Sequence, residues 1–293
     1  MLTVILQQGI NGLVVGSLYV LVALGLTLIY GVLVQINFAH ADIVTLGAFV
    51  AYFVTHLLSD NYFAGIAFAL IVGGALGWLL NTAIFAPLRD RGNELLPLIA
   101  TIGVSIMLQN AMLLMLGPVP YAFDTPYSNH VIRFGGIFFT VQNLLIIVVS
   151  TITIGLLYTF MKFTFLGKAL RAVSQDRETA GLMGINPNYI IMLTFIIASA
   201  LAGMSGALLG PVLVLTPFAG TSVIVKAFAI VIIGGFGNVE GTIIAGLIVG
   251  LIESYTTQFL DPGLIDIIVF ALLLLTLAVR PTGLIAERRD ENV

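Results

Sequence analysis

The sequence predicts an all-α fold, a polytopic transmembrane bundle of about eight to ten helices that forms one domain over residues 1–293. Hydrophobic residues make up 59% of the chain and charged residues only 9%, whereas soluble domains carry roughly 25% charged residues. Apolar runs close to the length that crosses a bilayer also recur from one end of the chain to the other. A soluble core could not bury this much apolar surface.

The apolar runs lie at residues 10–32, 41–57, 63–85, 95–116, 137–160, 189–209, 222–236, 241–258 and 264–280. A full crossing takes about 20 residues, so the short runs 41–57 and 222–236 are expected to be tilted, broken or re-entrant. Glycines spaced as G-x-x-x-G occur at Gly12/Gly16, Gly73/Gly77, Gly206/Gly210 and Gly246/Gly250. We expect these pairs to pack helices within the chain rather than to form dimers.

The distribution of Lys and Arg predicts the orientation. Nine of the eleven such residues lie in three places: Arg89 and Arg91, the segment 161–188 (Lys162, Lys168, Arg171 and Arg177), and Arg280, Arg288 and Arg289. Cytoplasmic loops carry this excess, so all three places and the C-terminus are expected in the cytoplasm. The loop 118–136 then faces outward, and counting back from Arg89 puts the N-terminus outside.

The segment 161–188 contains a predicted short helix. Asp176 suits the N-cap position, residues 177–183 make about two turns, Gly184 suits a left-handed C-terminal cap, and Pro187 prevents continuation. Two turns are not stable alone in water, so the helix is expected to pack against something. Docking to a soluble partner and an ordinary solvated loop helix are both compatible with this pattern.

Polar residues at membrane depth are candidates for function. Asn37, His40 and Asp42, together with Gln35, lie where the first two apolar runs meet. A re-entrant segment here would line a pathway; alternatively, His40 and Asp42 cap a helix after a short cytoplasmic turn. No ligand spacing supports His40 as a metal ligand.

Three other polar groups interrupt apolar sequence. Gln109 and Asn110 form an amide pair that is expected to bond a neighbouring helix, with substrate contact as the alternative. Lys226 and Glu253 are expected in the outer half, where snorkelling explains them, and a salt bridge between them is conceivable. The glycine-rich stretch 232–246 predicts a tight cytoplasmic turn, in which Glu240 either contacts a partner or is solvated.

The sequence lacks the residues and motifs of several enzyme classes. It has no Cys, and no H-E-x-x-H, G-x-S-x-G or Walker A motif. We therefore expect no catalytic residues, no metal and no cofactor. The net charge of −3 gives no argument for binding nucleic acid.

The chain resembles the branched-chain amino-acid permeases of ABC importers, the LivH/LivM kind, with the LivH type closer. The resemblance is carried by GLVVGSLYVLVALGLTLIYGV (12–32), INFAHADIVTLGAF (36–49), LIATIGVSIMLQN (98–110), GKALRAVSQDRETAGLMGIN (167–186), KAFAIVIIGGFGNVEG (226–241) and RPTGL (280–284). Glu178-Thr179-Ala180 with Gly184 is similar to the E-A-A-x-x-x-G coupling loop, with Thr179 in place of Ala. Ala41 stands where the family usually has Gly, and Val239-Glu240 stands where Ile-Pro is common. The second change falls in a turn, so no residue role is transferred from the family to that position.

The resemblance implies a permease subunit of an ATP-driven importer in the bacterial inner membrane. Its partners would be two ATP-binding subunits, which hydrolyse the ATP, a second homologous permease, and a periplasmic binding protein that delivers a branched-chain amino acid. The coupling loop would include Gly167, Arg171, Asp176, Arg177, Glu178, Ala180 and Gly184. Asn37, His40, Asp42, Gln109 and Asn110 are the candidates for the pathway lining.

Other functions remain compatible with the sequence. Relatives in the same superfamily handle urea, short amides and other amino acids. An ion-coupled secondary transporter would need a carboxylate within the membrane, for which Asp42 and Glu253 are the candidates. A membrane enzyme is disfavoured because no acid–base or metal constellation is present.

Overall fold

The computed structural model describes residues 1–58, 60–89 and 95–285, and in these ranges it is mostly helical. The main helices are α1 (Leu2–Leu33), α2 (His40–Leu57), α3 (Tyr62–Leu80), α4 (Ala86–Arg89), α5 (Leu95–Leu116), α6 (Val141–Phe163), α7 (Phe165–Gln175), α8 (Arg177–Leu182), α9 (Pro187–Leu209), α10 (Ala219–Gly234), α11 (Val239–Phe259) and α12 (Ile265–Val279). A π-helical turn, Asn81–Phe85, joins α3 to α4, and a 3₁₀ turn, Pro262–Leu264, precedes α12.

Eight helical segments in the described ranges are long and apolar enough to cross a membrane. They are Leu2–Leu33, His40–Leu57, Tyr62–Arg89, Leu95–Leu116, Val141–Phe163, Pro187–Leu209, Val239–Phe259 and Pro262–Val279, with α10 as a shorter apolar helix. The predicted polytopic helical fold is therefore confirmed. The first segment begins at Leu2 rather than at residue 10.

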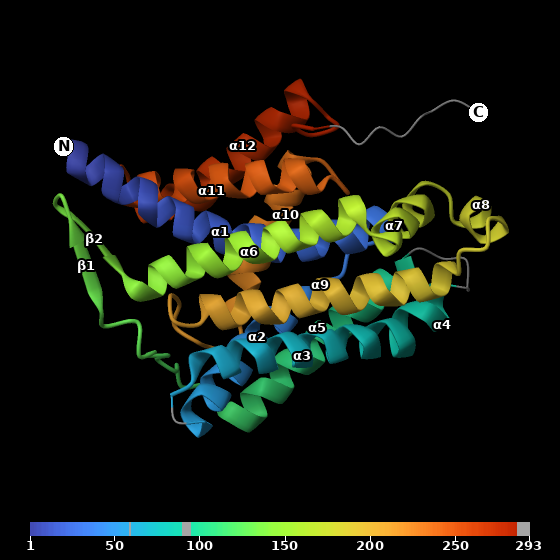
Figure 1. The fold of residues 1–293 in the computed structure, drawn as a ribbon, viewed down its shortest axis with the longest axis horizontal. Coiled ribbons are helices and arrows are strands. Elements are labelled where there is room, and N and C mark those ends of the chain that lie inside the picture. Colours follow the sequence, from blue (N-terminus) through green and yellow to red (C-terminus); the bar gives the residue numbers. More distant parts are fainter. Residues whose placement is uncertain (59, 90–94, 286–293) are drawn as a thin grey trace.

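The two ends of the bundle are formed by different elements, as Figure 1 shows. The N-terminus and a β-hairpin lie at one end, and α4, α7 and α8 lie at the other, which we call the basic end. Among the described residues, the basic end carries Arg89, Lys162, Lys168, Arg171, Arg177 and Arg280. Arg91, Arg288 and Arg289, which were also predicted to face the cytoplasm, lie outside the described residues.

A β-hairpin corrects the prediction of one apolar helix over 137–160. Strand β1 (Val131–Phe134) pairs antiparallel with β2 (Ile137–Thr140), and Phe134 is the register partner of Ile137. The two residues between them are Gly135 and Gly136, at φ 57° and 85°, the positive angles that a two-residue hairpin turn requires. The helix α6 therefore begins only at Val141, where the Thr140 side chain accepts a hydrogen bond from the Asn143 amide.

The segment between α1 and α2 turns back into the protein. Although α1 continues to Leu33, the Nε2 atom of His40 lies 3.3 Å from the carbonyl oxygen of Val22. Because each helical residue rises about 1.5 Å, the chain returns past roughly three turns of α1 before α2 begins. The chain is therefore re-entrant at this junction, as one of the two interpretations predicted, rather than forming a short turn between helix ends.

A second helix, α10, also begins inside the protein. The amide of Gly220, in its first turn, donates to the Thr45 hydroxyl of α2 at 2.9 Å. From there α10 runs to the glycine turn before α11, where Gly235 and Gly237 have φ of 104° and 78°, as predicted for a tight turn. Beyond α12, the amide of Leu284 donates to the carbonyl oxygen of Ile233 beside this turn at 2.8 Å.

Glycines allow backbones to touch at two helix crossings. A Cβ on Gly12 would lie 2.8 Å from the Leu251 Cα, and one on Gly250 would lie 2.3 Å from the Gly16 Cα, so α1 packs on α11 without intervening side chains. The helices α3 and α9 meet in the same way through Gly73 and Gly203. The predicted packing within the chain is therefore confirmed for these pairs.

We predict that Gly203→Ala destabilises the protein, since its Cβ would lie 2.2 Å from the Ala69 carbonyl oxygen. Overpacking of this kind costs about 1–3 kcal/mol. The matched control is Gly155→Ala on α6, where nothing lies within 4 Å of the added carbon. Thermal unfolding in detergent should show a lower midpoint for Gly203→Ala only, and equal midpoints would contradict the close crossing.

Candidate functional site

The short helix α8 projects from the basic end and has defined caps at both termini. The Asp176 Oδ1 atom accepts from the amides of Glu178 and Thr179 at 2.9 and 3.1 Å. The Thr179 hydroxyl, where the resembling motif has Ala, also donates to Asp176. These hydrogen bonds, first that of the Thr179 hydroxyl, lower the pKa of Asp176, so the ionised cap persists at neutral pH and is lost as the pH falls through this lowered pKa.

The C-terminus of α8 follows the Schellman pattern. The amide of Ile185 donates to the Ala180 carbonyl and that of Gly184 to the Gly181 carbonyl, both at 3.1 Å. Gly184 has φ 86°, the left-handed angle predicted for it. Asn186 then caps α9, which begins at Pro187. Only Ile185 and Asn186 therefore lie between the cap residue Gly184 and the membrane-spanning helix α9.

The surface of α8 is suited to contact with another molecule. Leu182 is 88% exposed and Met183 79% exposed, whereas Ala180 is buried against the protein. Large apolar side chains this exposed at the charged end of a membrane protein are candidates for an interface. Arg177 and Glu178 form the first turn of the same helix. These two exposed apolar side chains distinguish α8 from a polar solvated loop helix.

The preceding helix, α7, was not anticipated, since the sequence predicted only one helix in this loop. Gly167 permits the sharp entry into α7, because a Cβ there would lie 2.4 Å from the Phe160 carbonyl oxygen. The guanidinium of Arg171 donates to the Met161 carbonyl at the end of α6. The sequence does carry a signal for this helix, the amphipathic spacing of Leu166, Leu170 and Val173. Leu170 and Val173 are buried, as this spacing implies.

Two groups of interior polar residues near the start of α2 form a single cluster. Asn37 and His40 are fully buried in the re-entrant segment, and the Asn37 side chain accepts from the Ala39 amide at 3.1 Å. Asp42 lies two residues further along α2 and accepts from the Gln109 side-chain amide of α5 at 3.0 Å. Asn110 instead donates to its own helix at Ile106 and is exposed. Gln109 thus joins this cluster, and Asn110 does not.

Several atoms of the cluster are buried without a partner among the described residues. They are Asn37 Nδ2, His40 Nδ1, Asp42 Oδ2 and Gln35 Oε1. A buried polar group without a hydrogen bond is costly, and such groups are often kept for function. The cluster therefore offers both donors and acceptors where the chain breaks its helical hydrogen bonding inside the protein.

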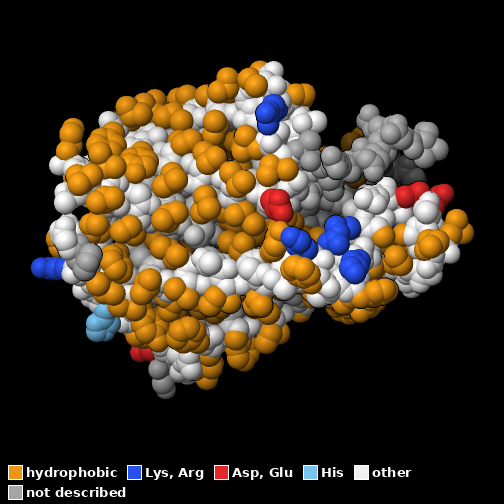
Figure 2. Space-filling view, turned by 45° about the horizontal axis from the view of Figure 1, so that its top comes forward, with side chains coloured by type: hydrophobic (Ala, Val, Ile, Leu, Met, Phe, Trp, Pro, Cys, Tyr) orange, Lys and Arg blue, Asp and Glu red, His pale blue; other side chains and the backbone are white. Residues whose placement is uncertain are grey.

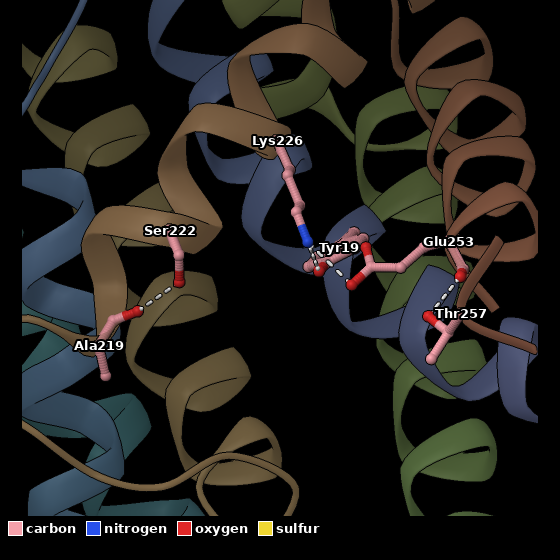
Figure 3. Close-up of polar contacts among 6 residues, drawn as sticks. All are labelled: Tyr19, Ala219, Ser222, Lys226, Glu253 and Thr257. Carbon is pink, nitrogen blue, oxygen red and sulfur yellow. Dashed lines mark hydrogen bonds and ion pairs between the residues drawn. The ribbon is translucent and has the colours of Figure 1, made fainter. Parts of the chain in front are cut away.

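A third polar group joins three helices, as Figure 3 shows. The Lys226 ammonium of α10 lies 2.8 Å from the Glu253 carboxylate of α11 and 3.1 Å from the Tyr19 hydroxyl of α1. The two charged side chains are only 14% and 17% exposed, so they are paired rather than snorkelling to the surface. The salt bridge that the sequence left conceivable is confirmed. It ties α10 to the α1–α11 pair.

Together, these features define a class of protein. A bundle with eight candidate spans, polar groups at breaks in its interior helices, and a projecting capped helix at a basic end is the arrangement of a membrane permease.

The chain belongs to the family described as the branched-chain amino acid transport system permease component, whose profile matches residues 9–277. It is 36% identical to the permease protein BraD of Pseudomonas aeruginosa over 98% of both chains. It is 34% identical to the permease protein LivH of Escherichia coli over 98% of this chain and 97% of that one. The permease LivM of E. coli is 25% identical over 94% and 69%. No solved structure matches significantly.

The buried ion pair gives a prediction. Removing one partner leaves an uncompensated buried charge, so Glu253→Gln and Lys226→Met should each destabilise the protein by about 3 kcal/mol. The double variant should lie closer to the wild type than either single variant. A double-mutant cycle of thermal unfolding in detergent measures this coupling. Additive effects of the two substitutions would show that the pair does not act as a unit.

Proposed function

We propose that this chain is the permease subunit of an ATP-driven importer that carries branched-chain or related hydrophobic amino acids across a bacterial inner membrane. For this proposal, we infer the substrate from the names of BraD and LivH, which are permeases of branched-chain amino acid transport systems. Its energy source is external, since the sequence contains no nucleotide-binding motif. The single observation that carries it is α8, a capped helix with exposed Leu182 and Met183 joined to the membrane-spanning α9.

The basic end is proposed to face the cytoplasm, together with the C-terminus, because Lys and Arg concentrate in cytoplasmic loops. Two ATP-binding subunits would then meet the permease there, one of them at α8. A second, homologous permease, of the kind represented by LivM, would complete the membrane part. A periplasmic binding protein would deliver the substrate at the opposite end, near the β-hairpin.

Transport in this proposal follows from movement of α8. When the ATP-binding subunits close, they displace α8, and the short connection through Asn186 passes this displacement to α9. The helix α9 lies against the re-entrant segment, because the Ala198 carbonyl oxygen and the His40 ring both closely approach Gly25. A shift of α9 would therefore change the surroundings of Asn37 and His40, the proposed lining of the pathway.

Ion coupling is less well supported by the geometry. The two carboxylates that could serve it are each engaged with another side chain, Asp42 with Gln109 and Glu253 with Lys226. A substrate such as urea or a short amide would use the same ATP-dependent machinery. Competition against labelled leucine in vesicles distinguishes these substrates from branched-chain amino acids.

We predict that charge reversal in α8, as Glu178→Lys or Arg177→Glu, uncouples transport. Leucine uptake by vesicles that contain the assembled transporter should fall at least about tenfold, the effect of losing roughly 1.4 kcal/mol of coupling. ATP hydrolysis and assembly should persist, because the substitutions change the contact and leave the membrane helices intact.

The matched controls are Glu178→Asp and Arg177→Lys, which keep each charge and should retain most of the uptake. Wild-type uptake in both reversal variants would contradict a coupling role for α8. Uptake that follows the membrane potential in the absence of ATP would instead favour an ion-coupled transporter.

A further inference from the structure

A cavity of about 390 Å³ opens at the basic end between α1, α6, α7 and the start of α11. Its volume falls within the roughly 300–1,000 Å³ typical of small-molecule sites. Leu28, Met161 and Leu170 supply an apolar base. The cavity is separate from α8 and from the re-entrant cluster, so the proposed transport cycle leaves it unexplained.

The rim of the cavity carries charges of both signs. Lys162 donates to the Tyr158 hydroxyl at 3.1 Å, and this hydroxyl donates to the Glu240 carboxylate, also at 3.1 Å. Arg171 lines the same cavity from α7. Two cations and one carboxylate around one opening suit a ligand that has an anionic group with an ammonium group close to it.

The position of the cavity favours a ligand with apolar tails. Phe163 and Phe165, which follow Lys162, are 67% and 79% exposed and present an apolar surface beside the cavity. Further toward the N-terminus of α6, the exposed Ile152 and Leu156 continue this apolar surface. Figure 2 shows basic side chains and an acidic one gathered at the edge of a broad hydrophobic surface.

We propose that this cavity binds the headgroup of a membrane phospholipid, with phosphatidylethanolamine preferred. The phosphate lies against Lys162 and Arg171, the ethanolamine ammonium lies against Glu240, and the acyl chains run along Ile152 and Leu156 of α6. Basic pockets between membrane helices commonly hold lipid headgroups. A free amino acid carries the same two charges but has no chains to cover α6. The cavity lies at the basic end, so the bound lipid belongs to the cytoplasmic leaflet. This assignment of the leaflet is the one part that rests on the proposed orientation of the transporter.

The test uses the purified full-length chain in nanodiscs of phosphatidylcholine with equal small fractions of phosphatidylethanolamine and phosphatidylglycerol. After transfer to mild detergent, native mass spectrometry identifies the lipids that remain bound. The wild type should retain phosphatidylethanolamine above its share. Lys162→Gln should lower its retention about fivefold, the effect of one basic residue near a lipid headgroup, and Lys162→Arg should restore it.

The Glu240→Gln variant should abolish the preference for phosphatidylethanolamine over phosphatidylglycerol, because only the ammonium headgroup gains from the carboxylate. The control is Lys168→Gln on α7, which is exposed and does not line the cavity. Equal lipid retention in Lys162→Gln and Lys168→Gln would overturn the proposal. Displacement of the bound lipid by millimolar leucine would overturn it in favour of a free amino acid. Neither result depends on the ATP-binding subunits.

Discussion

Direct backbone contact between α9 and its neighbours α2 and α3 is the constraint on which the rest of the structure depends. A Cβ on Gly47 would lie 2.2 Å from the Gly203 carbonyl oxygen, and one on Gly77 would lie 2.3 Å from the Phe195 carbonyl oxygen. With no side chains between them to change rotamer, these helices have little freedom to slide, since packed interiors transmit strain. We infer that α2, α3 and α9 move together, as do α1 and α11, which meet through their own glycines. The two units touch each other at one such close approach, where a Cβ on Gly25 of α1 would lie 2.8 Å from the Ala198 carbonyl oxygen of α9.

The polar groups of the interior lie where these two units meet. The side chain of His40, the first residue of α2, lies against Gly25 and the Val22 carbonyl oxygen of α1. The helix α10 contacts both units, through the Gly220–Thr45 hydrogen bond to α2 and through Lys226 to Glu253 and Tyr19. A relative movement of the units would therefore act first on α10 and on the re-entrant segment, which holds the residues that we propose to line the pathway.

The sequence predicted most of the helices because their apolar runs have no competing signal, and it predicted the cap of α8 because Asp176, Gly184 and Pro187 act locally. It did not predict the β-hairpin, since Ile137 to Thr140 are as apolar as the helix that follows them and only the Gly135–Gly136 pair marks the turn. The Asp42–Gln109 and Lys226–Glu253 contacts join residues far apart in the chain, and spacing alone cannot specify which helices become neighbours. The path of residues 34–39 likewise depends on the neighbouring helices that satisfy its backbone.

Distances between spin labels test the two-unit account most directly. Labels at Tyr189 of α9 and Leu79 of α3 report within one unit, and labels at Tyr189 and Ile244 of α11 report between units; all three positions are exposed. When ATP is added to the assembled transporter, the account predicts that the Tyr189–Ile244 distance changes by several ångström while the Tyr189–Leu79 distance stays constant. An equal change in both distances, or a change in Tyr189–Leu79 alone, would contradict it.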